Sequence, residues 1–249
     1  MSLLLDLGNT RLKWACAQAG MPGQAHAQSW ESIETEGLSP DWLSAARASR
    51  RILAASVAGT QREQRVSRAL QAHGLGEPLW LRSPAQACGV RNAYPQPQRL
   101  GVDRFLAMVA SRDAGLAPCV VTSVGTALTL DALDAEGRHL GGLIAPGPRL
   151  MQQSLHRATA GLPETGDAAW VDAADDTEDA IVSGCWSAAL GLVGHFHARM
   201  LQRLGTHCRV VLCGGDAVPL AGRLAMPNEV RPDLVLHGLA VWDREHPGG

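Results

Sequence analysis

Three short turns that contain glycine each follow an apolar stretch of the sequence. They lie in Asp6–Thr10, in Ser123–Ala127 and in Gly214–Asp216. Glycine lets main-chain N–H groups approach the oxygens of a phosphate because no side chain stands in the way, and a neighbouring Thr or Asn adds a further donor. Any single turn of this kind is more commonly an ordinary hairpin or strand end. Only the order of the three turns along the chain can therefore indicate that they share a function.

The elements around the first turn predict a strand-rich beginning. Leu3–Leu7 and Leu12–Ala17 are apolar runs on either side of the turn, which predicts a β-hairpin. Ile52–Ala58 is a further apolar run, and Thr60–Gly74 has helical spacing of its apolar residues and ends in glycine. We therefore expect strand, strand, strand, helix and strand in this first part.

A long loop separates this part from a buried helix. Residues 82–100 are rich in Pro, Gly, Gln and Arg without a sustained period, and long loops inside compact domains are usually functional. Val102–Ala114 has the apolar spacing of a buried helix, so Gly101–Arg104 falls at a junction between loop and helix.

The second part begins as the first does. Cys119–Val124 and Leu128–Leu133 flank the second glycine turn, which repeats the opening hairpin and indicates duplicated halves. Thr177–Leu204 predicts one long helix whose start is crowded with acidic residues, where the helix dipole favours negative charge. Val210–Cys213 predicts a strand that ends in the third turn.

Two matching hairpin turns followed by Gly214-Gly215 resemble the ATP site of the superfamily that includes actin, Hsp70 and the sugar and acetate kinases. The Walker P-loop pattern, which would offer a competing explanation, does not occur. The resemblance implies an α/β fold of two duplicated RNase H-like (actin-like ATPase) lobes, residues 1–115 and 116–249, with a nucleotide cleft between them.

Within that superfamily the sequence resembles type III pantothenate kinase over most of its length. The family patterns Asp-x-Gly-Asn-Thr-x-x-Lys and Gly-x-Asp-Arg both occur, and five segments follow the family's order at compatible spacings. The segments are Asp6–Lys13, Tyr94 with Gly101–Arg104, Gly125–Ala127 with Asp131, Gly141–Gly147 leading to Thr159–Pro163, and Asp176–Ile181 with Gly184.

The resemblance implies that the first two turns hold the phosphates of ATP and that the Gly-Gly turn lies against the adenosine. Asp6 would position Mg²⁺ through water, since Mg²⁺ sheds its hydration reluctantly. Lys13 could contact phosphate, although an alternating strand also turns a lysine outward for solubility alone. The implied ATP-binding residues are Asp6, Gly8, Asn9, Thr10, Lys13, Gly125, Thr126, Gly214 and Gly215.

The resemblance also assigns Asp103 as the general base that takes the proton of the pantothenate hydroxyl. Its ordinary alternative is an acid at a helix N-terminus, worth roughly 0.3–1 kcal/mol. Arg104 would bind the pantothenate carboxylate; its ordinary alternative is a surface ion pair. Tyr94 would contact pantothenate, or it is an aromatic residue of the loop that half-covers the core. Thr177 would also contact pantothenate, or its hydroxyl caps the helix that begins there. The implied acceptor-binding residues are Tyr94, Gly101, Val102, Asp103, Arg104 and Thr177.

Ser123 departs from the family, which usually has aspartate there at a site for a monovalent cation such as K⁺ or NH₄⁺. A neutral hydroxyl deprives a cation of its main charge partner. We therefore expect weak or altered K⁺ activation.

Composition excludes several other classes of protein. Hydrophobic residues make up 46% and charged residues 18%, and the net charge of -2 lacks the basic excess of a nucleic-acid-binding protein. An acid interrupts the first apolar run, no run is long enough to span a bilayer, and six scattered cysteines form no C-x-x-C pair. We expect a cytoplasmic protein with reduced cysteines and no membrane partner.

The leading hypothesis is a kinase that makes 4′-phosphopantothenate, the first committed step towards coenzyme A. One alternative is a kinase of the same superfamily with another small acceptor. Another is a regulatory protein, like the accessory factors for transcription among the family's relatives, that kept the fold and lost turnover. The resemblance also implies a homodimer, with the segment after Pro146 near the acceptor site and the interface.

Overall fold

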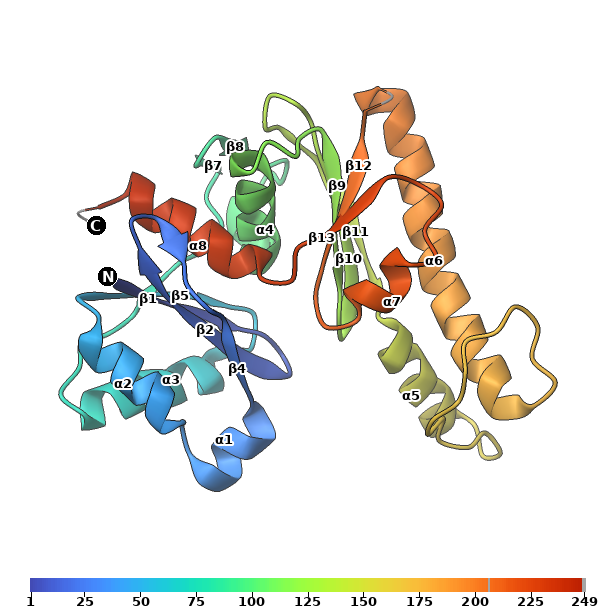
Figure 1. The fold of residues 1–249 in the computed structure, drawn as a ribbon, viewed down its shortest axis with the longest axis horizontal. Helices are drawn as coiled ribbons and strands as arrows, with labels where there is room; N and C mark the ends of the chain where they lie inside the picture. The colour runs from blue at the N-terminus through green and yellow to red at the C-terminus, as the bar shows by residue number, and fades with distance from the viewer. Residues whose placement is uncertain (206, 248–249) are drawn as a thin grey trace. The chain divides into compact units, whose positions relative to one another are not determined.

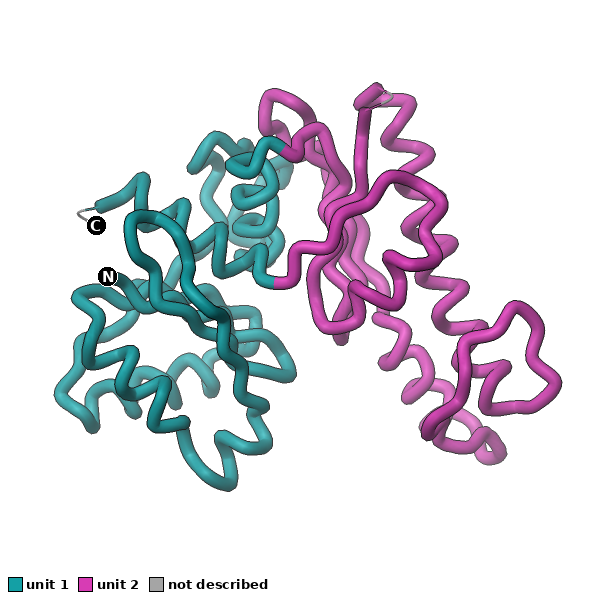
Figure 2. The backbone as a smooth tube through the Cα atoms, in the orientation of Figure 1, with its two compact units in different colours: residues 1–115, 233–249 teal, residues 116–232 magenta. Residues whose placement is uncertain are grey.

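The computed structural model describes residues 1–205 and 207–247, and these divide into two units (Figure 2). Unit 1 contains residues 1–115 and the chain from Asp233 on. Unit 2 contains Leu116–Pro232. Each unit has a mixed β-sheet with helices packed on it (Figure 1).

The sheet of unit 1 has the strand order β3-β2-β1-β5-β6, and β4 pairs with β2. β1 runs antiparallel to β2 and parallel to β5. The antiparallel pair is the predicted opening hairpin, whose strands both extend a residue or more beyond the apolar runs. The strands are β1 (Ser2–Leu7), β2 (Arg11–Gln18), β3 (Met21–Pro22), β4 (His26–Ser29), β5 (Arg51–Ser56) and β6 (Leu79–Trp80).

The sheet of unit 2 repeats this topology with the order β11-β10-β9-β12-β13. β9 is antiparallel to β10 and parallel to β12, as β1 is to β2 and β5. The duplication predicted from two hairpins therefore extends to all five positions of the sheet. The strands are β9 (Cys119–Val124), β10 (Ala127–Leu133), β11 (His139–Pro146), β12 (Arg209–Cys213) and β13 (Asn228–Val230).

Strand β1 separates two hydrophobic cores because its side chains alternate between the faces of the sheet. Leu3, Leu5 and Leu7 pack on the face covered by α1, α2 and α3. Leu4 packs on the opposite face with residues of α4 and α8. Asp6 lies two residues after Leu4 and therefore shares its face. The helices are α1 (Trp30–Glu36), α2 (Pro40–Ala48), α3 (Thr60–Ala72), α4 (Val102–Asp113) and α8 (Leu234–Glu245).

Helix α8 is the last helix of the chain, and it belongs to unit 1 rather than to the second lobe, where the sequence analysis had placed it. Its residues Leu236 and Leu239 pack in the same core as Leu4 and Leu106. At Gly238 the helix comes so close to α4 that a Cβ atom would lie 2.2 Å from the carbonyl oxygen of Leu106. Apolar packing on unit 1 thus determines where the C-terminal helix lies, and its position in the sequence does not.

Unit 2 has its core under the long helix α6, whose Trp186, Ala189 and Val193 pack on β9, β10 and β12. The Asp176 side chain caps this helix by accepting the N–H groups of Glu178 and Asp179. The predicted helix Thr177–Leu204 coincides with α6. The helices of unit 2 are α5 (Pro148–Ala158), α6 (Thr177–Leu204) and α7 (Ala217–Ala221).

The predicted long loop of residues 82–100 contains only small elements. They are the strands β7 (Gln86–Ala87) and β8 (Val90–Arg91) and the 3₁₀ helix η1 (Pro97–Arg99). In the part of the chain that the structure describes, no helix is both long and apolar enough to cross a membrane.

Candidate active site

Four charged side chains of unit 1 gather on the face of the sheet that α4 and α8 cover. Asp6 near the end of β1 is in register with Lys13 of β2. Asp103 lies in the first turn of α4, and Asp233 immediately precedes α8. The Lys13 Nζ is 3.4 Å from Oδ1 of Asp233. The predicted phosphate and catalytic residues Asp6, Lys13 and Asp103 are thus brought together by two strands and the start of α4.

The half-buried carboxyl of Asp6 has a strongly perturbed pKa. Burial, followed by the negative charge of Asp103, raises the pKa of Asp6 from 3.8 to about 7; Asp233 adds to the increase, and Lys13 opposes it. A carboxyl group that is costly to ionise in this place becomes easier to ionise when a cation binds beside it.

This set of oxygen ligands fits Mg²⁺. Among residues 1–205 and 207–247, no three His, Cys, Asp or Glu side chains are arranged to hold a metal ion by themselves. Mg²⁺ is usually held by one or two carboxylates together with waters and the phosphates of a substrate, and Asp6 beside Asp103 can supply such carboxylates.

The backbone at the start of α4 orients Asp103. Oδ1 of Asp103 accepts the N–H of Arg104 at 2.8 Å. A Cβ atom at the N-cap residue Gly101 would lie 2.5 Å from that same oxygen. Glycine at position 101 is therefore what allows the carboxylate to lie back over the start of the helix.

Two predicted acceptor contacts, Arg104 and Tyr94, are hydrogen-bonded to each other. Arg104 is buried, at 6% exposure, and its Nη1 donates to the hydroxyl of Tyr94 at 3.3 Å. The N–H of Tyr94 in turn donates to the side chain of Asn92. Arg104 is thus buried and does not form the surface ion pair that was the alternative to a role in binding. Val102 differs from Arg104 and Tyr94. Its side chain packs in the core with Leu106, so only its main chain can contact a ligand.

The first glycine turn is held rigidly by its carbonyl groups. The indole of Trp30 donates to the oxygen of Gly8 at 2.7 Å, and Arg62 donates to the oxygen of Asn9 at 2.6 Å. The main-chain N–H of Trp30 donates to the oxygen of Thr10, and the N–H of Gly8 donates within the hairpin to Arg11. Any phosphate contact of this turn therefore falls to groups other than the N–H of Gly8.

The second and third glycine turns lie against each other in unit 2. Gly214 has φ +94°, and a Cβ there would lie 2.3 Å from the oxygen of Val124. The N–H of Asp216 donates to the same oxygen at 3.1 Å. The structure thus brings the predicted Gly125–Thr126 and Gly214–Gly215 segments together.

Ser123 occupies in β9 the position that Asp6 occupies in β1, two residues before the glycine of the turn. It is half-buried and in register with Thr129 of β10 and Cys213 of β12. The nearest predicted acid in the same hairpin, Asp131, is engaged with His139 at 2.9 Å. The aligned strand residues therefore give Ser123 hydroxyl and thiol neighbours and no carboxylate.

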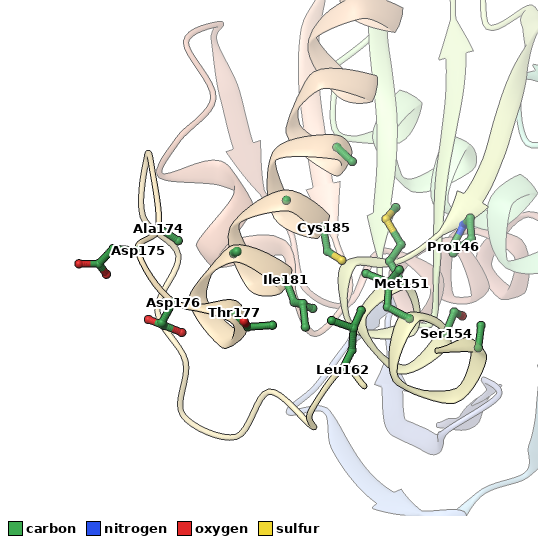
Figure 3. A pocket seen from close by; sticks show the side chains of 15 residues that line it. Pro146, Met151, Ser154, Leu162, Ala174, Asp175, Asp176, Thr177, Ile181 and Cys185 are labelled. Atoms are coloured by element: carbon green, nitrogen blue, oxygen red, sulfur yellow. The ribbon is translucent and has the colours of Figure 1, made fainter. Parts of the chain in front are cut away.

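Thr177 lines a largely apolar cavity of about 1010 Å³ in unit 2 (Figure 3). The side chain of the preceding residue, Asp176, caps α6. Thr177 therefore does not have the capping role that was the alternative to a contact with pantothenate. Thr177 belongs to unit 2, whereas the Arg104–Tyr94 pair belongs to unit 1. The cavity is also lined by Pro146, Met151, Leu155, Leu162, Ile181 and Cys185.

Asp233 has no counterpart among the predicted site residues. An acid just before an apolar helical stretch is an ordinary sign of a helix start, so it carries no functional signal by itself. The contact with Lys13, 220 positions away in the chain, and the effect of its charge on the pKa of Asp6 connect Asp233 to the other charged residues.

Solved structures with the same fold confirm the predicted actin-like α/β class. A Campylobacter jejuni protein described as a candidate Baf family transcriptional activator aligns with a TM-score of 0.62 and 18% identity over 98% of both chains. The activator of 2-hydroxyisocaproyl-CoA dehydratase from Clostridium difficile aligns with a TM-score of 0.55 and 13% identity, over 98% of this chain and 94% of that one. At these identities the likeness concerns the fold alone.

Sequence comparison is more specific. Residues 2–199 match the type III pantothenate kinase family. Proteins named type III pantothenate kinase from Xanthomonas campestris and Laribacter hongkongensis are each 41% identical to this chain, and the alignments cover 96% of it and 96% and 97% of those proteins. A protein of the same name from Aromatoleum aromaticum is 38% identical over 98% of both chains. The chain therefore belongs to the type III pantothenate kinase family.

Proposed function

We propose that the protein transfers the γ-phosphate of ATP to the hydroxyl group of pantothenate and so makes 4′-phosphopantothenate in the first step of coenzyme A biosynthesis. The observation that carries this proposal is the placement of Asp103 beside Asp6, Lys13 and the Arg104–Tyr94 pair. One carboxylate faces a metal and phosphate site, and the neighbouring one lies beside groups suited to a carboxylated alcohol.

The chemistry requires positioning and charge stabilisation more than covalent help from the protein. Asp103 accepts the hydroxyl proton of pantothenate as that oxygen forms its bond to the γ-phosphorus. The bond from this phosphorus to the β,γ-bridging oxygen breaks, and ADP leaves. Asp6 would hold Mg²⁺, which would supply positive charge that offsets the phosphate oxygens. Lys13 lies beside Asp6 and adds further positive charge.

Arg104 and Tyr94 bind the acceptor in this proposal. A guanidinium can pair with the pantothenate carboxylate through two parallel hydrogen bonds. The hydroxyl of Tyr94 lies 3.3 Å from Nη1 of Arg104 and helps to keep the guanidinium in place. Thr177, a residue of unit 2, is the further acceptor contact that the family resemblance implies.

The first prediction tests the general base. Asp103→Asn keeps the size of the side chain and removes the proton acceptor, so kcat should fall by about 10²–10⁴-fold. The measurement is ADP release with pantothenate, with mass spectrometry of the product. Asp41→Asn is the matched control because Asp41 is likewise an acid in the first turn of a helix, α2, and it should leave kcat unchanged.

Two results would contradict the assignment. Full turnover by Asp103→Asn would leave Asp103 as an ordinary helix-start acid. ADP release with glucose or acetate, but not with pantothenate, would keep the ATP site and exclude the proposed acceptor.

The homodimer is also part of the proposal. Its support is the apolar lining of the cavity between α5 and α6 (Figure 3), together with exposed Leu143, Ile144 and Leu155 on the neighbouring strand and helix. Apolar patches exposed on a single chain commonly mark protein interfaces. A second copy of the chain is the occupant that the family resemblance implies.

We place the reaction in the cytoplasm. The six cysteines, which all lie in the described part of the chain, form no disulfide bond, and burial raises the pKa of Cys119 to about 12, which makes its thiol a poor nucleophile. Cysteines that form no disulfide bond suit a reducing compartment.

A further inference from the structure

An exposed arginine lies beside the two glycine turns of unit 2. Arg149 is the second residue of α5, and its Nε donates to Oδ1 of Asp216 at 2.8 Å. The Asp216 side chain is 11% exposed and that of Arg149 is 69% exposed. One edge of the guanidinium is therefore fixed by a buried carboxylate, while most of the side chain remains accessible.

The ion pair joins the start of α5 to the residue that follows the Gly214-Gly215 turn. Gly147, two residues before Arg149, donates its N–H to the oxygen of Thr126, and a Cβ there would lie 1.9 Å from the oxygen of Gly125. Asp216 immediately follows Gly214-Gly215 and donates its own N–H to Val124. The start of α5 and the Gly-Gly turn thus both pack on the second hairpin turn, and the Arg149–Asp216 contact connects them.

The guanidinium retains unused hydrogen-bonding capacity. Within the described residues, Asp216 is the hydrogen-bond partner found for Arg149, and it engages Nε. The two Nη atoms carry four further N–H donors in a planar arrangement that matches two phosphate oxygens. The turn residues Gly125, Thr126, Gly214 and Gly215 are uncharged, so Arg149 supplies positive charge at this place.

We propose that Arg149, positioned by Asp216, is a nucleotide-binding residue that contacts the phosphate groups of ATP. This inference rests on the proposed function, because it takes the turns of unit 2 to be nucleotide-binding segments. Arg149 adds a positively charged contact from α5. The other predicted nucleotide-binding residues of unit 2 offer only main-chain and hydroxyl donors.

The test compares ATP with adenosine, which lacks phosphate, by calorimetric titration at constant salt. Arg149→Ala should weaken ATP binding by about 10–100-fold, the range for a hydrogen bond to a charged group, and should leave adenosine binding unchanged. Arg149→Lys, which keeps the charge but loses the planar pair of donors, should fall between Arg149→Ala and the unchanged protein. The matched control is Arg157→Ala, which removes an exposed arginine from the last turn of the same helix and should change neither affinity.

The role of Asp216 is tested with Asp216→Asn, which removes the ionic partner and keeps the guanidinium. ATP binding should weaken less than in Arg149→Ala, with adenosine binding unchanged. Wild-type ATP affinity in Arg149→Ala, or an equal loss for ATP and adenosine, would overturn the phosphate contact. An unmodified protein that binds no ATP would instead defeat the proposed function, so the two failures are distinguishable.

Discussion

The carboxyl group of Asp6 lies where its negative charge is costly. Burial and the neighbouring acids Asp103 and Asp233 raise its pKa to about 7, and the ammonium of Lys13 offsets part of this effect. Near neutral pH the group is therefore divided between its protonated and ionised forms. A cation bound beside it would favour the ionised form, so metal binding and proton release should be linked at this residue.

This perturbed pKa predicts how stability depends on pH in buffer without metal or nucleotide. The pKa of Asp6 is higher in the folded protein than in the unfolded chain, so the folded state binds more protons between about pH 4 and pH 7. Stability therefore falls as pH rises through that window. About three pKa units correspond to at most about 4 kcal/mol of unfolding free energy.

Asp6→Asn removes this penalty. Urea unfolding should show the variant more stable than the unmodified protein at pH 8, with a much smaller difference at pH 4.5. Asp41→Asn, at an exposed position on α2, should show no such pH-dependent gain. If Asp6→Asn is equally or less stable than the unmodified protein at pH 8, ionisation of the Asp6 carboxyl group does not destabilise the folded state.

Ser123 predicts the response to monovalent cations. The position corresponds to Asp6 in the duplicated hairpin, yet it offers a neutral oxygen with Thr129 and Cys213 as aligned neighbours. Kinase activity should therefore rise only weakly with K⁺. Ser123→Asp should introduce the missing charge and make activity rise more steeply as KCl replaces a bulky organic cation at constant ionic strength. Strong, saturable K⁺ activation of the unmodified protein that Ser123→Ala abolishes would refute this reasoning.

The sequence predicts those site residues that occur in short local motifs. Asp6 and Asp103 belong to short patterns whose members are neighbours in the sequence. Asp233 and Arg149 are not, because their roles arise from contacts with Lys13 and Asp216, which are 220 and 67 positions away. A single charged residue near a helix start looks the same whether it contacts solvent or a distant side chain.

Among the elements, those with strong start and stop signals were predicted best. Helix α6 coincides with the prediction because Asp176 caps its start and Gly205, with φ +83°, ends it. The helices α1 and α2 were missed, since seven and nine residues provide little periodicity. Strand β11 contains Gly141-Gly142 and ends at Pro146, residues that disfavour a strand in isolation, and its pairing with β10 overrides them.

Helices α4 and α8 cross closely at Gly238. Gly238→Ala would place a methyl group 2.2 Å from the backbone oxygen of Leu106, so the helices must separate. The free energy of unfolding should fall by roughly 1–3 kcal/mol, measured by chemical denaturation. Gly191→Ala is the control, because position 191 lies on an exposed part of α6 with nothing within 4 Å of the added atom, and alanine there should be neutral or stabilising. Equal stability of the two variants would mean that α8 does not need close approach to α4.

For the molecule as a whole, duplication and chain order do not coincide. Both units have the same five-position sheet, but the chain returns to unit 1 for its last helix. Leu4 and Leu53 of unit 1 are buried together with Leu236 of α8, so the core of unit 1 is completed only by the end of the chain. The division at residue 115 could be inferred from the repeated hairpin. The return of α8 to unit 1 could not be inferred, because the sequence of an apolar helix that follows unit 2 does not indicate on which sheet the helix packs.

The proposed homodimer can be tested through one exposed side chain at the apolar cavity. Leu155 is 39% exposed on α5, so Leu155→Asp should fold normally while placing a charge where a second copy would have to exclude water. Sedimentation velocity should then show a shift from dimer towards monomer, with Kd raised at least about tenfold. Val218→Asp is the matched control, since Val218 is 68% exposed on α7 and does not line the cavity. If both variants retain the same dimer as the unmodified protein, or if the unmodified protein is a monomer, the cavity is not the surface on which two copies meet.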